Sequence, residues 1–189
     1  LQAQLMWAEA ALNSDGAQPA PQAVTGVLAS LPAKGRRAAW EELSALGIEY
    51  LFRPRWSLYA LDQARVPELM QSASGQEQRR IAANRIEVLI AAGEPAGALR
   101  EGESAWREQN EIGDRIVLSA LLWLAAVQVN DVPAQRRWSD DMLRYYGFLT
   151  NGTPMAWSFG GSRHLLEQAP ESEVRQKGLE LFGLLSMSR

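Results

Sequence analysis

The amino-acid sequence predicts an all-α protein that is built from antiparallel helix pairs. Apolar residues recur at intervals of three and four along most of the chain, which is the spacing of one face of an α-helix. Proline and glycine interrupt these stretches at points where helices begin and end. The stretch 116–129 contains no charged residue but is too short to cross a bilayer as a helix. It therefore indicates a helix that protein buries on nearly all sides.

The first part of the chain alternates helical patterns with breakers. Residues 14–21, which are rich in Ser, Gly, Gln and Pro, form the most linker-like segment. We expect one all-helical domain over residues 1–189, with the helix and linker of residues 1–20 docked loosely on it. The expected helices lie at residues 1–13, 22–31 and 36–51, and two more begin at Pro54 and at Pro67, because proline is tolerated in a first helical turn.

The middle of the chain carries the clearest helix boundaries. Ser74 and Glu77 form a capping box ahead of a helix that ends at Gly93, and Pro95 begins its partner. The apolar helix of residues 116–129 follows. We expect Asp114 to cap its start and Asn130 to close its end, and the next helix begins at Pro133. The helices joined at Gly93 and Pro95 and those joined at Asn130 and Pro133 share one pattern: an apolar helix end, a polar turn and a proline at the next helix start. This pattern indicates a helix-pair repeat.

The last part of the chain differs in composition. Residues 147–162 are rich in glycine and aromatic residues, which predicts an irregular segment. Such a segment either binds a ligand or covers an exposed end of the core. Helices are expected again at residues 163–168 and from Pro170.

Composition excludes several classes of protein and site. With 19 basic and 22 acidic residues the net charge is −3, which offers no electrostatic case for nucleic acid or anionic lipid as a partner. The chain has no cysteine, which excludes disulfides and thiolate ligands, and its single histidine excludes multi-histidine metal sites. We therefore expect neither a cofactor nor a metal. The prevalence of Arg over Lys, with abundant Ala, Gly and Pro, points to a GC-rich bacterial genome.

Two groups of residues resemble the tetratricopeptide repeat. Leu43, Leu46, Gly47 and Tyr50 follow the pattern L-x-x-L-G-x-x-Y, which is similar to the first helix of such a repeat. The second group consists of Leu89, Gly93, Ala98 and Ala105. The resemblance covers about half of the chain and implies an α-solenoid-like stack whose concave face binds a peptide or protein. An irregular helical bundle is the alternative, since any antiparallel helix pair needs a stop, a turn and a start.

The sequence contains none of the strong catalytic motifs: H-E-x-x-H, G-x-S-x-G, the Walker loop and G-x-G-x-x-G are absent. We therefore favour a non-catalytic protein–protein interaction module, acting as an adaptor or as an assembly or accessory domain of a larger bacterial envelope or secretion-type system. The expected partner is a protein or peptide and not a nucleic acid. We expect no membrane span in the chain itself, although a parent chain can be membrane-attached. The periplasm or cell envelope is the favoured compartment, and the cytoplasm is the alternative.

Arg53, Arg55 and Trp56 are the first candidate binding residues. They stand together in the segment R-P-R-W. An exposed tryptophan between guanidinium groups is suited to recognise a protein segment or a sugar, because Trp, Tyr and Arg dominate binding hot spots. The competing interpretation of Trp56 is ordinary core packing.

The second candidate site is the glycine-rich loop 157–164, which supports the alternative function of a small-molecule or carbohydrate-acting enzyme. Its candidate residues are Trp157, Ser162, Arg163 and His164. Glycine N–H groups at a helix start hold a phosphate or carboxylate, and His164 titrates near neutral pH. This site requires the polar side chains to converge with a carboxylate from elsewhere, such as Asp140 or Asp141. In the competing interpretation, Ser162 caps a helix and His164 lies on the surface.

The remaining aromatic and acidic residues predict structure and not chemistry. Four tryptophans fall on apolar stripes and are expected in the core: Trp40, Trp106, Trp123 and Trp138. Three carboxylates are expected in i,i+4 ion pairs on solvated helix faces: Glu103 with Arg107, Asp140 with Arg136, and Asp141 with Arg137.

Overall fold

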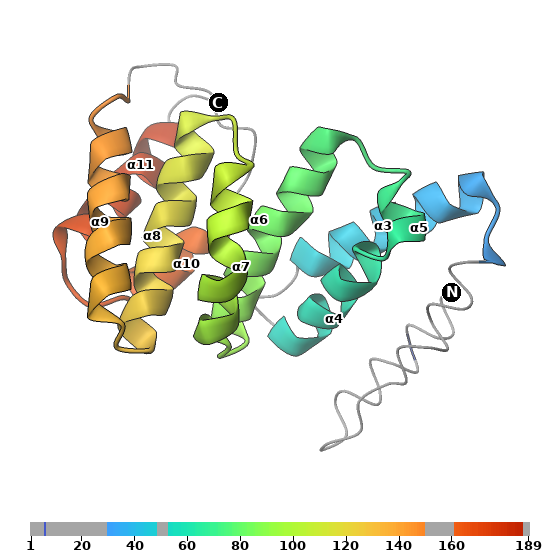
Figure 1. Ribbon diagram of the computed structural model, residues 1–189, viewed down its shortest axis with the longest axis horizontal. Helices are drawn as coiled ribbons and strands as arrows, with labels where there is room; N and C mark the ends of the chain where they lie inside the picture. The colour runs from blue at the N-terminus through green and yellow to red at the C-terminus, as the bar shows by residue number, and fades with distance from the viewer. Residues whose placement is uncertain (1–5, 7–29, 49–52, 150–160, 187–189) are drawn as a thin grey trace. The chain divides into compact units, whose positions relative to one another are not determined.

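The computed structural model describes residues 6, 30–48, 53–149 and 161–186 (Figure 1). Within these ranges the chain forms 9 α-helices and no β-strand, which confirms the predicted all-α fold class. The helices are α3 (Ala33–Ile48), α4 (Pro54–Ala64), α5 (Pro67–Met70), α6 (Gly75–Ala91), α7 (Pro95–Arg107), α8 (Ile112–Gln128), α9 (Val132–Tyr146), α10 (Ser162–Glu167) and α11 (Glu173–Ser186). Apart from Met6, the predicted helix and linker of residues 1–20 lie outside the described residues, as does most of the segment 147–162.

The chain divides into two compact units, residues 1–81 and residues 82–189. The boundary falls within α6, so that the first turns of this helix belong to the first unit and its remainder to the second. The single domain over residues 1–189 stays a prediction. None of the described helices combines the length and the apolarity needed to cross a membrane.

In the first unit, α3 packs against α4 at a close approach of their backbones. A Cβ atom added to Gly47 would lie 2.3 Å from Leu61 Cδ2, so any larger residue would force Leu61 to shift. Ser57 fixes the same contact by donating from its hydroxyl to the carbonyl of Leu46 at 2.9 Å. Gly47 in the pattern L-x-x-L-G therefore serves helix–helix packing.

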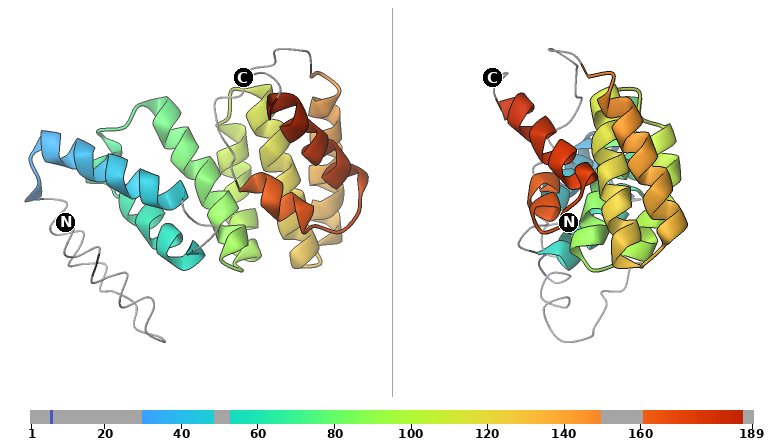
Figure 2. Two further views of the ribbon diagram at one scale, coloured as in Figure 1. Left: turned by 180° about the vertical axis from the view of Figure 1, so that it is seen from behind. Right: turned by 90° about the vertical axis from the view of Figure 1, so that its left-hand side faces the viewer.

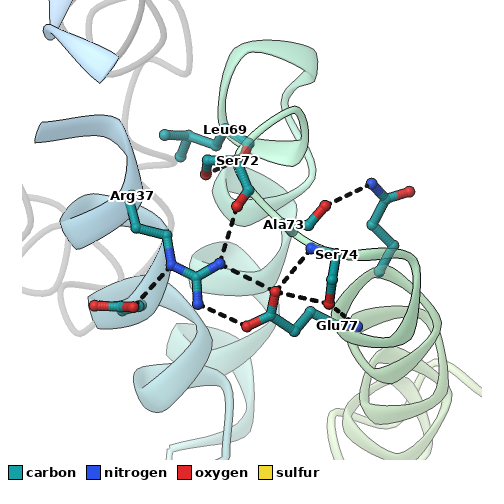
Figure 3. Close-up of polar contacts among 8 residues, drawn as sticks. Arg37, Leu69, Ser72, Ala73, Ser74 and Glu77 are labelled. Atoms are coloured by element: carbon teal, nitrogen blue, oxygen red, sulfur yellow. Dashed lines mark hydrogen bonds and ion pairs between the residues drawn. The ribbon is translucent and has the colours of Figure 1, made fainter. Parts of the chain in front are cut away.

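Arg37 ties α3 to the loop that precedes α6 (Figure 3). Its Nη2 and Nη1 atoms donate to the two carboxylate oxygens of Glu77 at 2.7 and 3.0 Å. Nη1 also donates to the Ser72 carbonyl at 2.9 Å, and Nε donates to Glu41 at 2.8 Å. The guanidinium thus joins three chain segments of the first unit through charge-assisted hydrogen bonds.

The predicted capping box at the start of α6 is confirmed (Figure 3). The Ser74 N–H donates to Glu77 Oε2 at 2.8 Å, and the Glu77 N–H donates to Ser74 Oγ at 3.3 Å. The hydrogen bonds from Arg37, followed by those from Ser74, lower the pKa of Glu77 from 4.5 to about 2. One carboxylate therefore caps α6 and holds α3 at the same time.

Because the folded pKa of Glu77 is depressed, its stabilisation is fully present above pH 4.5 and is lost as the pH falls towards 2. We expect Glu77→Gln to lower the free energy of unfolding by about 1 kcal/mol at neutral pH, since the pair reaches solvent. The difference from wild type should disappear at acid pH. Urea unfolding across this range measures it, with Glu41→Gln as the more exposed control. A difference that stays constant with pH would contradict the ionic origin of the effect.

Two turns of the second unit share one geometry. Gly93, with φ of 78°, follows α6, and Asn130, with φ of 57°, follows α8. Both turns close with the same hydrogen bond, from Glu94 N–H to the Leu89 carbonyl at 2.8 Å and from Asp131 N–H to the Ala126 carbonyl at 2.9 Å. Pro95 and Pro133 then stand in the first turns of α7 and α9. The predicted helix ends at Gly93 and Asn130 are therefore confirmed.

Helix α8 lies at the centre of the second unit. It packs against α7 and α9, and α10 and α11 cover it from behind (Figures 1 and 2). All residues from 116 to 126 are buried, which confirms the prediction for this part of the stretch 116–129, whereas Gln128 and Val129 are exposed. The predicted start was wrong, because Glu111 precedes the first residue of the helix and Asp114 is buried within its first turn.

Candidate functional site

The structure separates Trp56 from the two arginines that precede it. Arg53 and Arg55 are exposed, whereas Trp56 is 6% exposed and stacks on Tyr59 with 5.6 Å between ring centroids. This placement agrees with core packing, since so little of the indole reaches solvent. Binding of a partner by Arg53, Arg55 or Trp56 stays a prediction.

The polar residues of the glycine-rich segment do not converge. Ser162 is fully buried and donates to Glu87 Oε1 at 2.8 Å. Arg163 is exposed and pairs with Glu167, and the exposed His164 ring shares a 2.8 Å hydrogen bond with Gln168. Both pairs are i,i+4 contacts on the outside of α10. Trp157 lies outside the described residues.

The competing interpretation places His164 on the surface and makes Ser162 a helix cap. The first part agrees with the structure, and the second part is wrong. His164 lies on the surface of α10, as expected. Gly161 precedes the first residue of α10, so Ser162 is the first helical residue and not the cap. In the part of the chain that the structure describes, no group of three or more His, Asp and Glu side chains is placed to hold a metal ion.

A group of side chains that the sequence did not single out comes together on α7, α8 and α9 of the second unit. We name it the aromatic–arginine cluster, and it consists of Trp106, Arg115, Arg137, Trp138 and Tyr145. Trp106 stands at its centre, with its ring edge-on to Trp138 at 5.8 Å and to Tyr145 at 5.7 Å. Edge-to-face contacts of this kind are the favoured geometry of aromatic pairs. Trp138 is 3% exposed, whereas the other two rings are half-buried.

Two guanidinium groups lie over these rings. Arg115 lies over Trp106 at 5.0 Å and over Tyr145 at 5.7 Å, and Arg137 lies over Trp138 at 4.5 Å. Arg115 also donates from Nη1 to the Tyr145 hydroxyl at 3.2 Å and from Nε to the Gln109 carbonyl at 2.9 Å. Cation–π contacts are strongest where water is partly excluded, as it is around this half-buried side chain.

Hydrogen bonding and helix geometry position the rings. Trp106 Nε1 donates to Ser119 Oγ at 2.9 Å, and that hydroxyl donates to the Arg115 carbonyl at 2.8 Å. This chain of bonds fixes the indole of α7 against α8. On α9, Trp138 and Tyr145 are seven residues apart, which places them on the same face two turns from each other. The cluster is therefore preorganised by all three helices.

Glu103 supplies negative charge beside the cluster. It accepts from Arg137 at 3.1 Å and also from Arg107. The hydrogen bond from Arg137 is the main cause that lowers the pKa of Glu103. The predicted i,i+4 pair of Glu103 with Arg107 is confirmed, but the hydrogen bond of Arg137 goes to Glu103 on another helix, and Asp141 contributes only a longer-range attraction. The carboxylate of Glu103 on α7 therefore pairs with an arginine of its own helix and with one of α9.

Sequence reasoning missed the cluster because its members are far apart in the chain. Trp106 and Trp138 were assigned to the core on periodicity, and nothing local marks Arg115 or Tyr145 as their neighbours. The only local sign of the cluster in the sequence is on α9, where Arg137 stands beside Trp138 and Tyr145 follows two turns later. A comparison with protein-family models, curated proteins and solved structures finds no match to this chain.

Proposed function

We propose that the chain is a non-catalytic protein–protein interaction module, built from helix pairs that resemble tetratricopeptide repeats and acting as an adaptor or accessory domain in a bacterial envelope or secretion-type system. The single observation that carries the proposal is the aromatic–arginine cluster. It gathers the three residue types that are most enriched in binding hot spots on one face of three packed helices.

The physical state of the cluster supports this role. Its rings and guanidinium groups are already held by edge-on contacts and hydrogen bonds, so a partner would immobilise few side chains on binding. Trp106, Arg115 and Tyr145 are half-buried, which leaves part of each side chain in contact with solvent. Aromatic surfaces of this kind provide large contact area at low entropic cost.

The helices that pack on α8 also limit which surface of the second unit can bind a partner protein. The tetratricopeptide resemblance implies a groove on a concave face, but α10 and α11 pack on α8, and α11 also contacts α9. We therefore assign the binding surface to the side on which α7 and α9 meet, at Trp106 and Trp138.

Adjacent residues of α9 provide a matched test. Tyr145 belongs to the cluster, whereas its neighbour Tyr146 donates its hydroxyl to Glu180 and lies under Lys177 on another side of the helix. We expect peptides selected from a random phage-displayed library on the purified wild-type chain to lose about tenfold or more in affinity with Tyr145→Ala, in line with a hot-spot residue. Tyr146→Ala should retain binding.

Fluorescence anisotropy with the selected peptides measures these affinities, and circular dichroism verifies that each variant is folded. Arg137→Ala and Arg136→Ala form a second matched pair, since both side chains are exposed but only Arg137 lies over Trp138. If the library yields no specific binder, or if the two members of each pair behave alike, the proposed interaction surface is wrong.

A further inference from the structure

We propose that the aromatic–arginine cluster recognises an acidic segment of a partner protein, and that Arg115 is the residue that binds its carboxylate. This inference rests on the proposed function and adds the chemistry of the partner. The described residues offer Arg115 only neutral acceptors, the Gln109 carbonyl and the Tyr145 hydroxyl. Arg115 makes no ion pair with any carboxylate of the described residues.

The other two arginines in this region, Arg107 and Arg137, already pair with a carboxylate. Arg107 and Arg137 share Glu103, and Asp141 adds a further attraction to Arg137. Arg115 is different because it is half-buried and has no carboxylate partner among the described residues. A partly desolvated cation without an anion is costly, and an anion supplied by a partner removes that cost.

The geometry of Arg115 favours a carboxylate as that anion. A guanidinium has five N–H donors in a planar fork. The two bonds of Arg115 come from Nε and Nη1, and its Nη2 group has no acceptor among the described residues. The remaining edge of the fork matches the two oxygens of a carboxylate. The cation–π contacts with Trp106 and Tyr145 restrict the orientation of this fork.

The flanking rings define the rest of the partner segment. Trp106 and Tyr145 are half-buried and adjoin the Arg115 guanidinium, so an apolar side chain next to the acidic residue would pack on them. A basic segment would instead place like charge against Arg115 and Arg137. The cluster therefore selects an Asp or Glu that is adjacent to an apolar residue.

The test uses an array of synthetic peptides in matched sets. Each set keeps the same apolar residues and carries Glu, Gln or Lys at the flanking positions. We expect only the Glu peptides to bind wild type, with an affinity that falls as the salt concentration rises. Arg115→Met should weaken this binding about tenfold or more, because a charge-assisted bidentate contact is lost. Arg115→Lys keeps the charge without the fork and should weaken it less.

Arg136→Met is the matched control, because Arg136 is an exposed arginine of α9 outside the cluster. Thermal unfolding verifies that Arg115→Met and Arg115→Lys retain the wild-type fold. If Gln and Glu peptides bind equally well and both depend on Tyr145, the proposed function stands and the acidic preference is wrong. If no peptide of any set binds in a manner that depends on Tyr145, the interaction surface itself is wrong and the inference falls with it.

Discussion

Gly102→Ala is expected to destabilise the protein by about 2–3 kcal/mol, although helix propensity alone predicts a gain of about 1 kcal/mol. An added Cβ at Gly102 would lie 2.1 Å from Leu122 Cδ2 and 3.0 Å from its Cδ1. Leu122 is fully buried in α8, where close packing makes any shift of its side chain costly. The close approach of α7 to α8 therefore requires glycine at this position.

Urea unfolding followed by circular dichroism measures the effect of Gly102→Ala. Gly35→Ala is the control, because its nearest neighbour, Pro32 Cδ, lies at an ordinary distance of 3.5 Å. That substitution should be neutral or stabilising. In a Leu122→Ala background the cost of Gly102→Ala should be largely removed, since the two positions are in contact. An unchanged cost in that background would show that the clash is not its cause.

The same contact between α7 and α8 positions the proposed binding surface. Trp106 lies one turn after Gly102 on α7, and its hydrogen-bond partner Ser119 lies one turn before Leu122 on α8. Separating the helices at Gly102 would therefore lengthen the bond from Trp106 Nε1 to Ser119. We expect Gly102→Ala to alter the near-ultraviolet circular dichroism of the indole as well as the stability.

Ser162→Ala is expected to destabilise the second unit by about 2 kcal/mol, because a hydrogen bond to a buried carboxylate is lost. Ser162 is 0% and Glu87 2% exposed, and the hydroxyl lies 2.8 Å from Glu87 Oε1. Helix α10 has only 6 residues, which is too short for a helix to be stable without tertiary contacts. Loss of the bond should therefore loosen α10 before the rest of the unit.

Hydrogen exchange of the α10 amides measures this loosening, and chemical denaturation measures the loss of stability. Ser104→Ala is the matched control, since Ser104 Oγ makes the same kind of bond with Glu108 at 3.1 Å on an exposed surface. That substitution should change the stability by less than about 0.5 kcal/mol. Equal effects of the two substitutions would mean that burial does not strengthen the Ser162 bond.

Local signals in the sequence were sufficient for most helix boundaries. The capping box of Ser74 and Glu77 and the turns at Gly93 and Asn130 formed as predicted, because each depends on residues only a few positions apart. The start of α8 was misplaced because Asp114 resembles a cap, yet the chain continues as helix back to Ile112. Buried tertiary contacts override such preferences at helix ends.

The candidate site could not be predicted in the same way. For Trp56 the sequence leaves open both a surface site beside two arginines and ordinary core packing, and its stacking on Tyr59 agrees with core packing. Trp106 was assigned to the core, but it became the half-buried centre of the aromatic–arginine cluster. Whether a side chain on an apolar stripe is buried depends on which helices cover that stripe, and the sequence does not state this.

The sequence by itself therefore determined the all-α class, the burial of the apolar helix of residues 116–126, and the turns that reverse the chain after Gly93 and Asn130. These follow from periodicity and from backbone conformations that single residues set. Only the tertiary structure decided that Arg137 bonds to Glu103, and that Arg115 lies over two aromatic rings without a carboxylate partner among the described residues. The reason is physical: such contacts join residues that are many positions apart, and the packing of α7, α8 and α9 brings them together.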